Sequence, residues 1–472
     1  MSHDLMIRGG RVITADGQFT ADIAVSAGRI TAIGHGLGMA TETIDATGLM
    51  VTPGGVDPHC HIEQMSGMGL MNADTFETAT RSAAMGGTTS VISFAAQGKG
   101  QRLSEAVADY AARATRGAAI DHAFHLIVAD SAAPDLEADL HSLIAAGHRS
   151  IKVFTTYNIG LGDAEILRVL RIARTAGALT CIHAENDAII AETRTRLLAK
   201  GRTRPIDHAA SRPRAAEIEA VARMCRLAEL AQAPVMIFHV STQEAAAEIR
   251  AARARGAPVW AETCPHYLFQ TEDILDKPGI EGAKWMCSPP QRTARDQAAL
   301  WQALALGDLQ VVSSDHAPYR FDDTGKLSAG PDAPFPAIAN GMPGLELRQP
   351  LMFEAMVSRR RLGPESFVAL TATLPARLYG LDRKGDIAPG MDADLVLWDP
   401  TREVTYGAND LHDNVGYNPA EGTTVRGWPV RTILRGRTIM QDGTYLGQPG
   451  TGDWIARPRI GTHPTAITGV PT

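Results

Sequence analysis

The sequence predicts an α/β protein, a (β/α)8 TIM barrel with a small β-sandwich-like domain built from the N- and C-terminal segments. Between residues 51 and 320, short β-branched or apolar runs alternate with longer segments rich in Ala, Leu, Glu and Arg, as in repeated strand-helix units. On both sides of this block, short alternating strands replace that pattern. The chain has 472 residues, 44% of them hydrophobic, which is enough for a large barrel and a smaller companion domain.

The repeated block contains eight strand candidates separated by segments with helical spacing. One such segment, 243–257, has a glycine near its end, where a helix is expected to stop. Strand-helix-strand crossovers are right-handed, so eight successive units can close into a ring. The strands are expected at 51–63, 88–96, 121–128, 150–157, 179–186, 234–242, 259–268 and 309–318.

The flanking segments are each too short to form an independent sandwich. We therefore expect residues 1–52 and 385–450 to combine into one small β-domain beside a barrel domain at 53–384. The remaining C-terminal tail, 451–472, is rich in Gly, Pro and Thr and is expected to order only against another surface. A neighbouring subunit is one candidate for that surface.

Composition favours a small molecule as the partner. The formal net charge is -7 and no run of Lys or Arg longer than three residues occurs, which disfavours nucleic-acid binding. Neither a signal-like start nor a stretch of eighteen apolar residues is present, so secretion and membrane spanning are not expected. The five cysteines are dispersed, with no C-x-x-C pair, which favours reduced thiols in the cytoplasm over disulfides or a cysteine-rich zinc site.

Five potential metal ligands fall at the C-terminal ends of the expected strands, where barrel enzymes keep their active sites. His59 and His61 are two residues apart in the first strand, so both side chains project from the same face. His183, His239 and Asp315 end the fifth, sixth and eighth strands. Any one of them alone is more simply an ordinary core or surface polar residue. Five at the same end of one barrel predict a metal site.

Lys152 ends the fourth strand between apolar neighbours, which disfavours the ammonium form and lowers its pKa. A neutral amine can react with carbon dioxide. The resulting N6-carboxylated Lys152 carries a carboxylate on a long arm, which can bridge two divalent ions. The alternative is a lysine that extends to the barrel rim, and the surrounding ligands favour the bridging interpretation.

A resemblance to a known family appears once these segments are taken together. The chain resembles the hydantoinase/dihydropyrimidinase branch of the cyclic amidohydrolases, in the amidohydrolase superfamily, in DPHCHIE, SIKVFTTY, HAEN, FHVST, ETCPHYL, CSPPQR, SSDHAPY and NGMPGLELR. The resemblance implies two ions, for which zinc is the usual metal, and a homotetramer. It also implies that the more buried ion is bound by His59, His61, Lys152 and Asp315, and the more exposed one by Lys152, His183 and His239.

These groups predict the hydrolysis of a cyclic ureide, a hydantoin or dihydropyrimidine, to an N-carbamoyl amino acid. A hydroxide bridging the two ions attacks the ring carbonyl. Asp315 accepts the proton and delivers it to the leaving amide nitrogen. The resemblance places Tyr157, five residues beyond Lys152, to donate a hydrogen bond to the oxyanion.

The resemblance also implies that main-chain groups at Ser288 and Asn340 bind the alternating C=O and N–H groups of the ring. A helix-initiating role before Pro289 is an equal alternative for Ser288, and a turn role before Gly341 for Asn340. His266 is either an orienting partner of a ligand or a structural histidine, and we leave it out of the metal set.

Substrate specificity is expected in the loops after the first and fourth strands. The first loop carries an adaptable apolar surface, and the second is shorter than in hydantoinases, so the substituent and its enantiomer stay open. An allantoinase and a non-catalytic dihydropyrimidinase-related scaffold are the alternative functions. Tyr157 and NGMPGLELR favour the hydantoinase side, and the filled ligand positions disfavour the scaffold. The apolar residues of the first loop are Met65, Met68, Leu70 and Met71.

Overall fold

Eight parallel strands follow one another around a barrel, as the sequence predicts. The computed structural model describes residues 3–458. Each strand pairs with the next along the chain, and Cys60 pairs in parallel with His316 to close the ring. The strands are β6 (Gly55–Cys60), β7 (Thr88–Ala96), β8 (Asp121–Ile127), β9 (Ser150–Phe154), β10 (Leu179–His183), β11 (Val235–Ile237), β12 (Val259–Thr263) and β13 (Val311–Val312).

Several strands are shorter than the sequence predicts. The run at 234–242 forms only β11, and the run at 309–318 forms only β13. After β11 and β13 the chain stops pairing with the neighbouring strand, because the residues that follow adopt backbone angles that do not fit a β-sheet. His239 and Asp315, for example, have φ values of 39° and 47°. His61 likewise lies just beyond β6 rather than within it.

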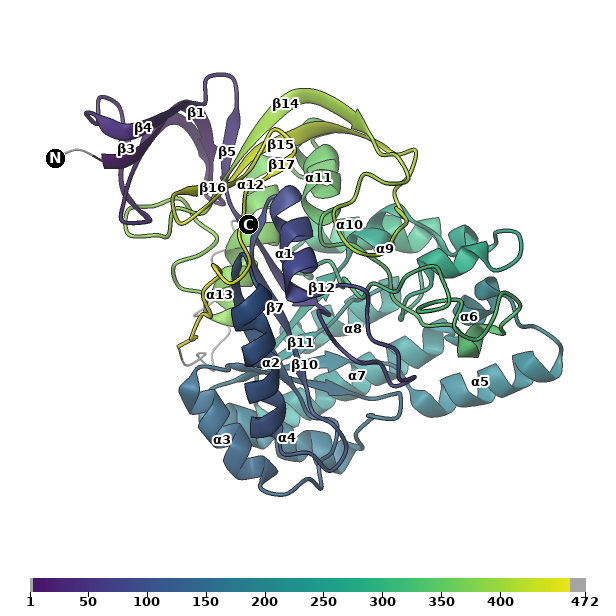
Figure 1. Cartoon of the computed structure of the whole chain (residues 1–472). Coiled ribbons are helices and arrows are strands. Elements are labelled where there is room, and N and C mark those ends of the chain that lie inside the picture. The colour runs from purple at the N-terminus through teal and green to yellow at the C-terminus, as the bar shows by residue number, and fades with distance from the viewer. Residues whose placement is uncertain (1–2, 459–472) are drawn as a thin grey trace.

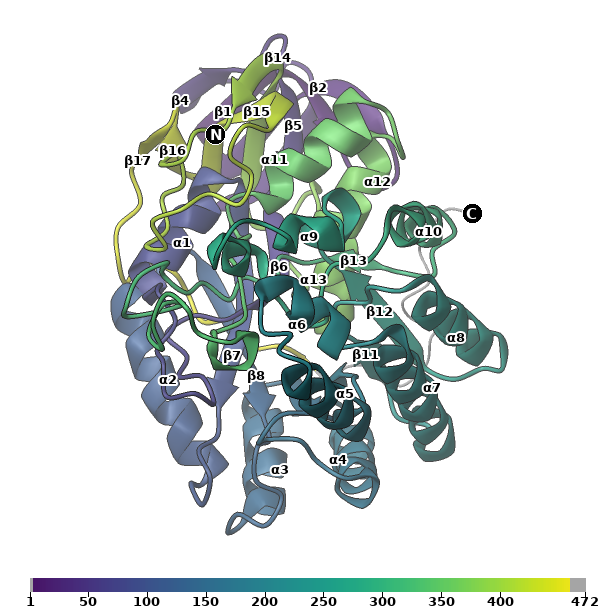
Figure 2. The same cartoon turned by 90° about the vertical axis from the view of Figure 1, so that its right-hand side faces the viewer.

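Helices surround the barrel (Figure 2). The first of them, α1, illustrates how the sequence specifies these helices. At its N-terminus the Thr75 hydroxyl accepts a hydrogen bond from the Thr78 N–H, and Ala79 and Ala83 are buried on its inner face. The helices that follow β6 to β12 are α1 (Phe76–Met85), α2 (Leu103–Gly117), α3 (Leu136–Ala146), α4 (Asp163–Ala176), α7 (Arg214–Ala231), α8 (Gln243–Ala254) and α10 (Ala294–Ala305).

Additional segments extend the C-terminal ends of the strands. Two extra helices, α5 (Asp187–Ala199) and α6 (Pro205–Ser211), precede α7 and project to the right in Figure 1. The connection after β12 contains α9 (Pro265–Phe269) and the 3-10 turns η1 (Glu272–Leu275) and η2 (Glu281–Trp285).

The N- and C-terminal segments together form the small β-domain at the top of Figure 1. Its nine-stranded mixed sheet has the order β17-β16-β15-β14-β5-β1-β2-β3, with β4 also paired to β1, and the two ends of the chain meet where β5 pairs with β14. A separate apolar core includes Val12, Ile23 and Leu395. The strands are β1 (His3–Ile13), β2 (Gln18–Ser26), β3 (Arg29–Gly34), β4 (Ala40–Asp45), β5 (Met50–Pro53), β14 (Leu395–Thr405), β15 (Thr424–Leu434), β16 (Arg437–Gln441) and β17 (Thr444–Tyr445).

Short helical segments connect the end of the barrel to β14 and pack against both parts. Buried Arg348 holds this region to the barrel by donating to the carbonyls of Val56 and Val312. The segments are η3 (Phe335–Ala337), α11 (Arg348–Phe353), η4 (Glu354–Ser358), α12 (Pro364–Val368), η5 (Ala369–Thr373) and α13 (Leu374–Tyr379), of which η4 and η5 are π-helical.

The expected tail, 451–472, is described only as far as Pro458, and 459–472 lie outside the described residues. Its described part runs beside the start of β8, where the His122 N–H donates to Asp453 O and the Ile455 N–H donates to His122 O. No helix within residues 3–458 is long and apolar enough to cross a membrane.

Candidate active site

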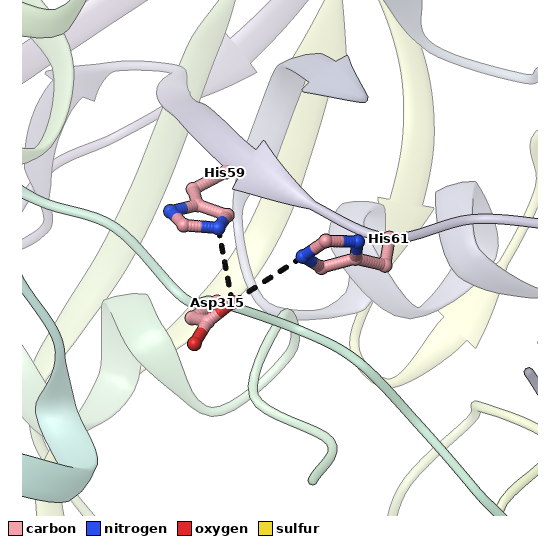
Figure 3. Close-up of side chains that lie close together, drawn as sticks. All are labelled: His59, His61 and Asp315. Atoms are coloured by element: carbon pink, nitrogen blue, oxygen red, sulfur yellow. Dashed lines mark ion pairs between the residues drawn. The ribbon is translucent and has the colours of Figure 1, made fainter. Parts of the chain in front are cut away.

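Three of the predicted ligands form a compact group at the barrel mouth. The Asp315 Oδ1 atom lies 3.0 Å from His59 Nε2 and 3.5 Å from His61 Nε2 (Figure 3). One donor atom from each residue lies within 4.8 Å of the others, a spacing that suits a shared metal ion. Burial alone would raise the pKa of Asp315, but the two histidines outweigh it and hold the pKa well below its usual range.

The far side of each imidazole is held by another side chain. The His59 Nδ1 atom contacts the buried carboxylate of Glu262, and His61 Nδ1 lies 2.5 Å from Gln64 Oε1. These contacts fix the ring orientations and leave both Nε2 atoms facing Asp315. Glu262 and Gln64 therefore support the metal-ligating geometry, although neither belongs to the predicted ligand set.

His183 and His239 form a second group, with their ring centroids 4.5 Å apart. The His183 Nε2 atom lies 2.7 Å from Glu185 Oε2, and Arg212 pairs with the same carboxylate. Within the described residues, the buried His239 Nδ1 has no hydrogen-bond partner. A buried polar atom without a partner is costly, so this group is suited to an additional ligand.

Lys152 lies between these two groups. It is 1% exposed, and its Nζ atom is 3.9 Å from the ring centroid of Phe238 and 4.8 Å from that of Phe154. The Phe238 ring packs against His59 at 4.1 Å, and the Phe154 ring stacks on His183 at 5.5 Å. Burial lowers the pKa of Lys152 to about 8, so a substantial fraction of the amine is neutral near physiological pH.

Three of the predicted residues have left-handed backbone conformations. The φ angles are 69° at Tyr157, 39° at His239 and 47° at Asp315. Such conformations are unfavourable for residues with a side chain, by about 1 kcal/mol or more each, and they concentrate at functional sites. They turn each side chain out of its strand direction, just where the strand ends.

Tyr157 extends the site beyond the second group. Its ring meets His183 edge-on at 5.3 Å, and the Arg212 guanidinium carbon lies 5.0 Å from the ring centroid. Burial raises the pKa of Tyr157 to about 12, despite the opposing charge of Arg212. The phenol therefore keeps its proton and can donate a hydrogen bond at neutral pH.

Ser288 and Asn340 lie together on this side of the site. The Ser288 hydroxyl donates to Asn340 Oδ1 at 3.0 Å and lies 3.3 Å from His208 Nε2. The helix-initiating alternative for Ser288 is wrong, because α10 begins later and Thr293 is its N-cap residue. His266 is buried, and its Nε2 has no hydrogen-bond partner in the described part of the chain.

Five further residues hold the site in place and were not predicted from the sequence, namely Gln64, Glu185, Arg212, Glu262 and His208. Two of them had a detectable signal. Glu262 is a lone acid within a buried apolar strand, and Glu185 follows His183 by two residues. His208 lies on the extra helix α6 and Arg212 directly follows it. Sequence alone gives no sign of their contacts.

The chain is similar to known proteins over nearly its whole length. A model of the amidohydrolase family matches residues 50–439. The D-hydantoinase of Ralstonia pickettii is 42% identical over 458 residues, covering 96% of this chain and 99% of that protein.

Solved structures give the same result for the fold. A D-hydantoinase structure has a TM-score of 0.93 at 41% identity and covers 97% of this chain and 99% of its own. The dihydropyrimidinase from Brevibacillus agri NCHU1002 has a TM-score of 0.93 at 39% identity, with the same coverage. The similarity therefore includes both the barrel and the β-domain.

Proposed function

Because the chain belongs to the amidohydrolase family, in its D-hydantoinase and dihydropyrimidinase branch of cyclic amidohydrolases, we propose that it opens a hydantoin or dihydropyrimidine ring. The product is an N-carbamoyl amino acid. One observation carries this proposal: two histidine groups lie on either side of a buried, partly neutral Lys152, with Asp315 and Tyr157 beside them.

The family is metal-dependent, and the donors of this chain fit two divalent ions. We propose that His59, His61 and Asp315 hold one, that His183 and His239 hold the other, and that N6-carboxylated Lys152 joins both. The unpartnered His239 Nδ1 and the imidazole-rich donor set support this assignment and favour zinc. When bound, such ions activate water and polarise a carbonyl oxygen.

The protein's own residues supply the proton transfers and the orientation. Asp315 is ionised, so it can accept a proton from the attacking water and pass it to the leaving nitrogen. Tyr157 keeps its proton and donates a hydrogen bond to the carbonyl oxygen as negative charge develops there. Ser288 and Asn340, which are joined to each other by a side-chain hydrogen bond, bind the ring through their main-chain groups.

Apolar side chains near the site favour a bulky substituent on the ring. Met65, Met68 and Met71 are between 45% and 53% exposed in the loop after β6. This loop approaches the one after β9 closely, because a Cβ on Gly67 would lie 2.8 Å from Asn158 Oδ1. Flexible thioethers adapt to aromatic groups, so we propose D-5-arylhydantoins as preferred substrates, in agreement with the D-hydantoinase relatives.

Ring-opening absorbance distinguishes the candidate substrates. We expect D-5-phenylhydantoin to be hydrolysed faster than the L enantiomer, hydantoin or dihydrouracil. Purified protein should contain close to two metal ions per chain. Hydrolysis of allantoin alone would instead assign an allantoinase and reject the proposed substrate.

We also propose a homotetramer and a cytoplasmic location, together with the domain division 1–52 plus 385–450 and 53–384. The pairing of β5 with β14 supports joining the two terminal segments. Light scattering after size-exclusion chromatography tests the tetramer, and a mass of one chain would reject it.

A further inference from the structure

Two buried basic side chains lie behind the proposed ring-binding residues. His208, on α6, places its Nε2 atom 2.9 Å from the carbonyl oxygen of Cys287. Lys326 places its Nζ atom 2.8 Å from the carbonyl oxygen of Ala339. Cys287 immediately precedes Ser288, and Ala339 immediately precedes Asn340. The same type of contact therefore occurs one residue before each proposed ring-binding position.

Each contact sets the direction of the following N–H group. Both peptide bonds are trans and planar, so the carbonyl and the next N–H point in opposite directions. A donor that holds the Cys287 carbonyl thus directs the Ser288 N–H away from His208, and Lys326 does the same for Asn340. The described residues provide no hydrogen-bond partner for either N–H, so both can bind a ligand.

The supporting side chains are themselves firmly placed. His208 is 4% exposed and Lys326 is fully buried. This region also contains a small apolar cluster, distinct from the cores of the barrel and the β-domain, that joins α6 to the loops after β12 and β13. Gly341 completes this unit: its N–H donates to Met286 O at 2.7 Å, and a Cβ at this position would lie 2.3 Å from Ala317 O. The buried members of the cluster are Ala209, Leu275, Ala283, Met286, Phe335 and Ile338.

Lys326 is difficult to explain as a stabilising residue. Among the described residues it forms no ion pair, and burying a basic group without one is unfavourable. An apolar side chain of similar length would fill the same space without that cost. What the amine adds is the hydrogen bond to Ala339.

We propose that His208 and Lys326 are positioning residues that orient the Ser288 and Asn340 main-chain groups for ring recognition. This rests on the proposed function, since the ring is a cyclic ureide. His208 is neutral, because burial lowers its pKa to about 3, and its single N–H is assigned to Nε2 by the carbonyl acceptor. Lys326 acts through the backbone, and His208 does so as well, although its Nε2 atom also lies 3.3 Å from the Ser288 hydroxyl. Neither residue is placed against the substrate.

Steady-state kinetics on D-5-phenylhydantoin test the proposal with Lys326→Met, His208→Leu and His208→Gln. Met and Leu remove the donor and keep apolar volume, while Gln keeps an N–H near the position of Nε2. We expect KM to rise about tenfold in Lys326→Met and His208→Leu with kcat and metal content nearly unchanged, because uniform binding is lost. His208→Gln should recover most of the KM, and exposed Lys200→Met is the matched control.

Hydrogen exchange of the metal-loaded protein provides a readout independent of activity. Peptides covering 283–288 and 335–341 should exchange about tenfold faster in Lys326→Met than in wild type. Without the hydrogen bond to Ala339 O, the segment that carries the Gly341 N–H opens more often from Met286 O. If wild-type protein opened no cyclic ureide, the proposed function would be rejected. Hydrogen exchange would still decide whether Lys326 positions the segment around Asn340. An unchanged KM in an active enzyme, or unchanged exchange in these peptides, would overturn the inference.

Discussion

Two buried lysines have opposite surroundings, one in the barrel mouth and one at the base, where the barrel meets the β-domain. Lys152 packs against aromatic rings, and burial lowers its pKa to about 8. Lys384 is equally inaccessible, but its Nζ atom lies 2.5 Å from Asp121, 2.7 Å from Asp394 and 3.0 Å from Asp392. Burial would lower the pKa of Lys384 too, yet the three carboxylates raise it above its ordinary value.

The difference separates a reactive lysine from a structural one. An amine without a compensating charge is partly neutral and available for carboxylation. An ammonium surrounded by carboxylates stays charged and ties together the elements that carry them, here β8 and the residues leading into β14. For Lys152 and Lys384, the surrounding charge rather than the depth of burial therefore distinguishes the two roles.

The largest expected effect is that of Lys152→Ala. We expect metal content to fall well below two ions per chain and activity to fall by about 10^4-fold, because the group joining the two ions is removed. Metal analysis and kinetics measure both, with exposed Lys200→Ala as the control. Full metal content in the variant would reject the bridging role.

Lys384→Met should instead lower the free energy of unfolding without affecting the proposed metal site. Removing the ammonium leaves buried Asp394 without a cationic partner among the described residues, and leaves Asp121 and Asp392 with only Arg435 and Arg383, at an expected cost of about 3–5 kcal/mol. Urea denaturation measures the loss, and metal content per folded chain should match wild type.

The pH dependence of that loss has a definite sign. Burial raises the pKa of Asp392, but the nearby Lys384 ammonium outweighs burial and lowers the pKa of this carboxyl. In wild type, the ion pair between Lys384 and Asp392 therefore stabilises the fold at neutral pH, and this stabilisation is lost as pH falls through the lowered pKa. Protonation also relieves the repulsion in the variant. The stability difference should therefore be larger at pH 8 than at pH 4, and a constant difference would contradict the assigned role.

The barrel and the grouping of the proposed metal ligands were predictable, because strand periodicity is local and each of these residues lies close to a strand end. His59, Lys152 and Asp315 required only strand order to be placed together. Lys384 and Asp121 are 263 residues apart in sequence, and no local pattern signals their contact. His208 and Lys326 were missed for the same reason: their acceptors are backbone carbonyls, which have no sequence signature.

A smaller effect is expected for the pH dependence of metal reconstitution. With a pKa of about 8, the neutral fraction of Lys152 rises from about 1% at pH 6 to about one half at pH 8. Metal-free protein given zinc at a fixed concentration of dissolved carbon dioxide should regain activity up to about fifty times faster at pH 8. A rate independent of pH would show that the amine is not the reacting form.

The smallest effect is expected for Arg435→Gln, which tests whether Arg435 shares the role of Lys384 at the base of the barrel. Arg435 is partly exposed and binds Asp121 Oδ1 at 2.8 Å, while Lys384 binds Oδ2 of the same carboxylate. Solvent can replace part of the Arg435 contact, so we expect a loss of about 1 kcal/mol. Both cations neutralise the Asp121 carboxylate. The loss in free energy of unfolding of the double variant with Lys384→Met should therefore differ from the sum of the two single losses by more than about 0.5 kcal/mol. Strict additivity would mean that the two cations act independently.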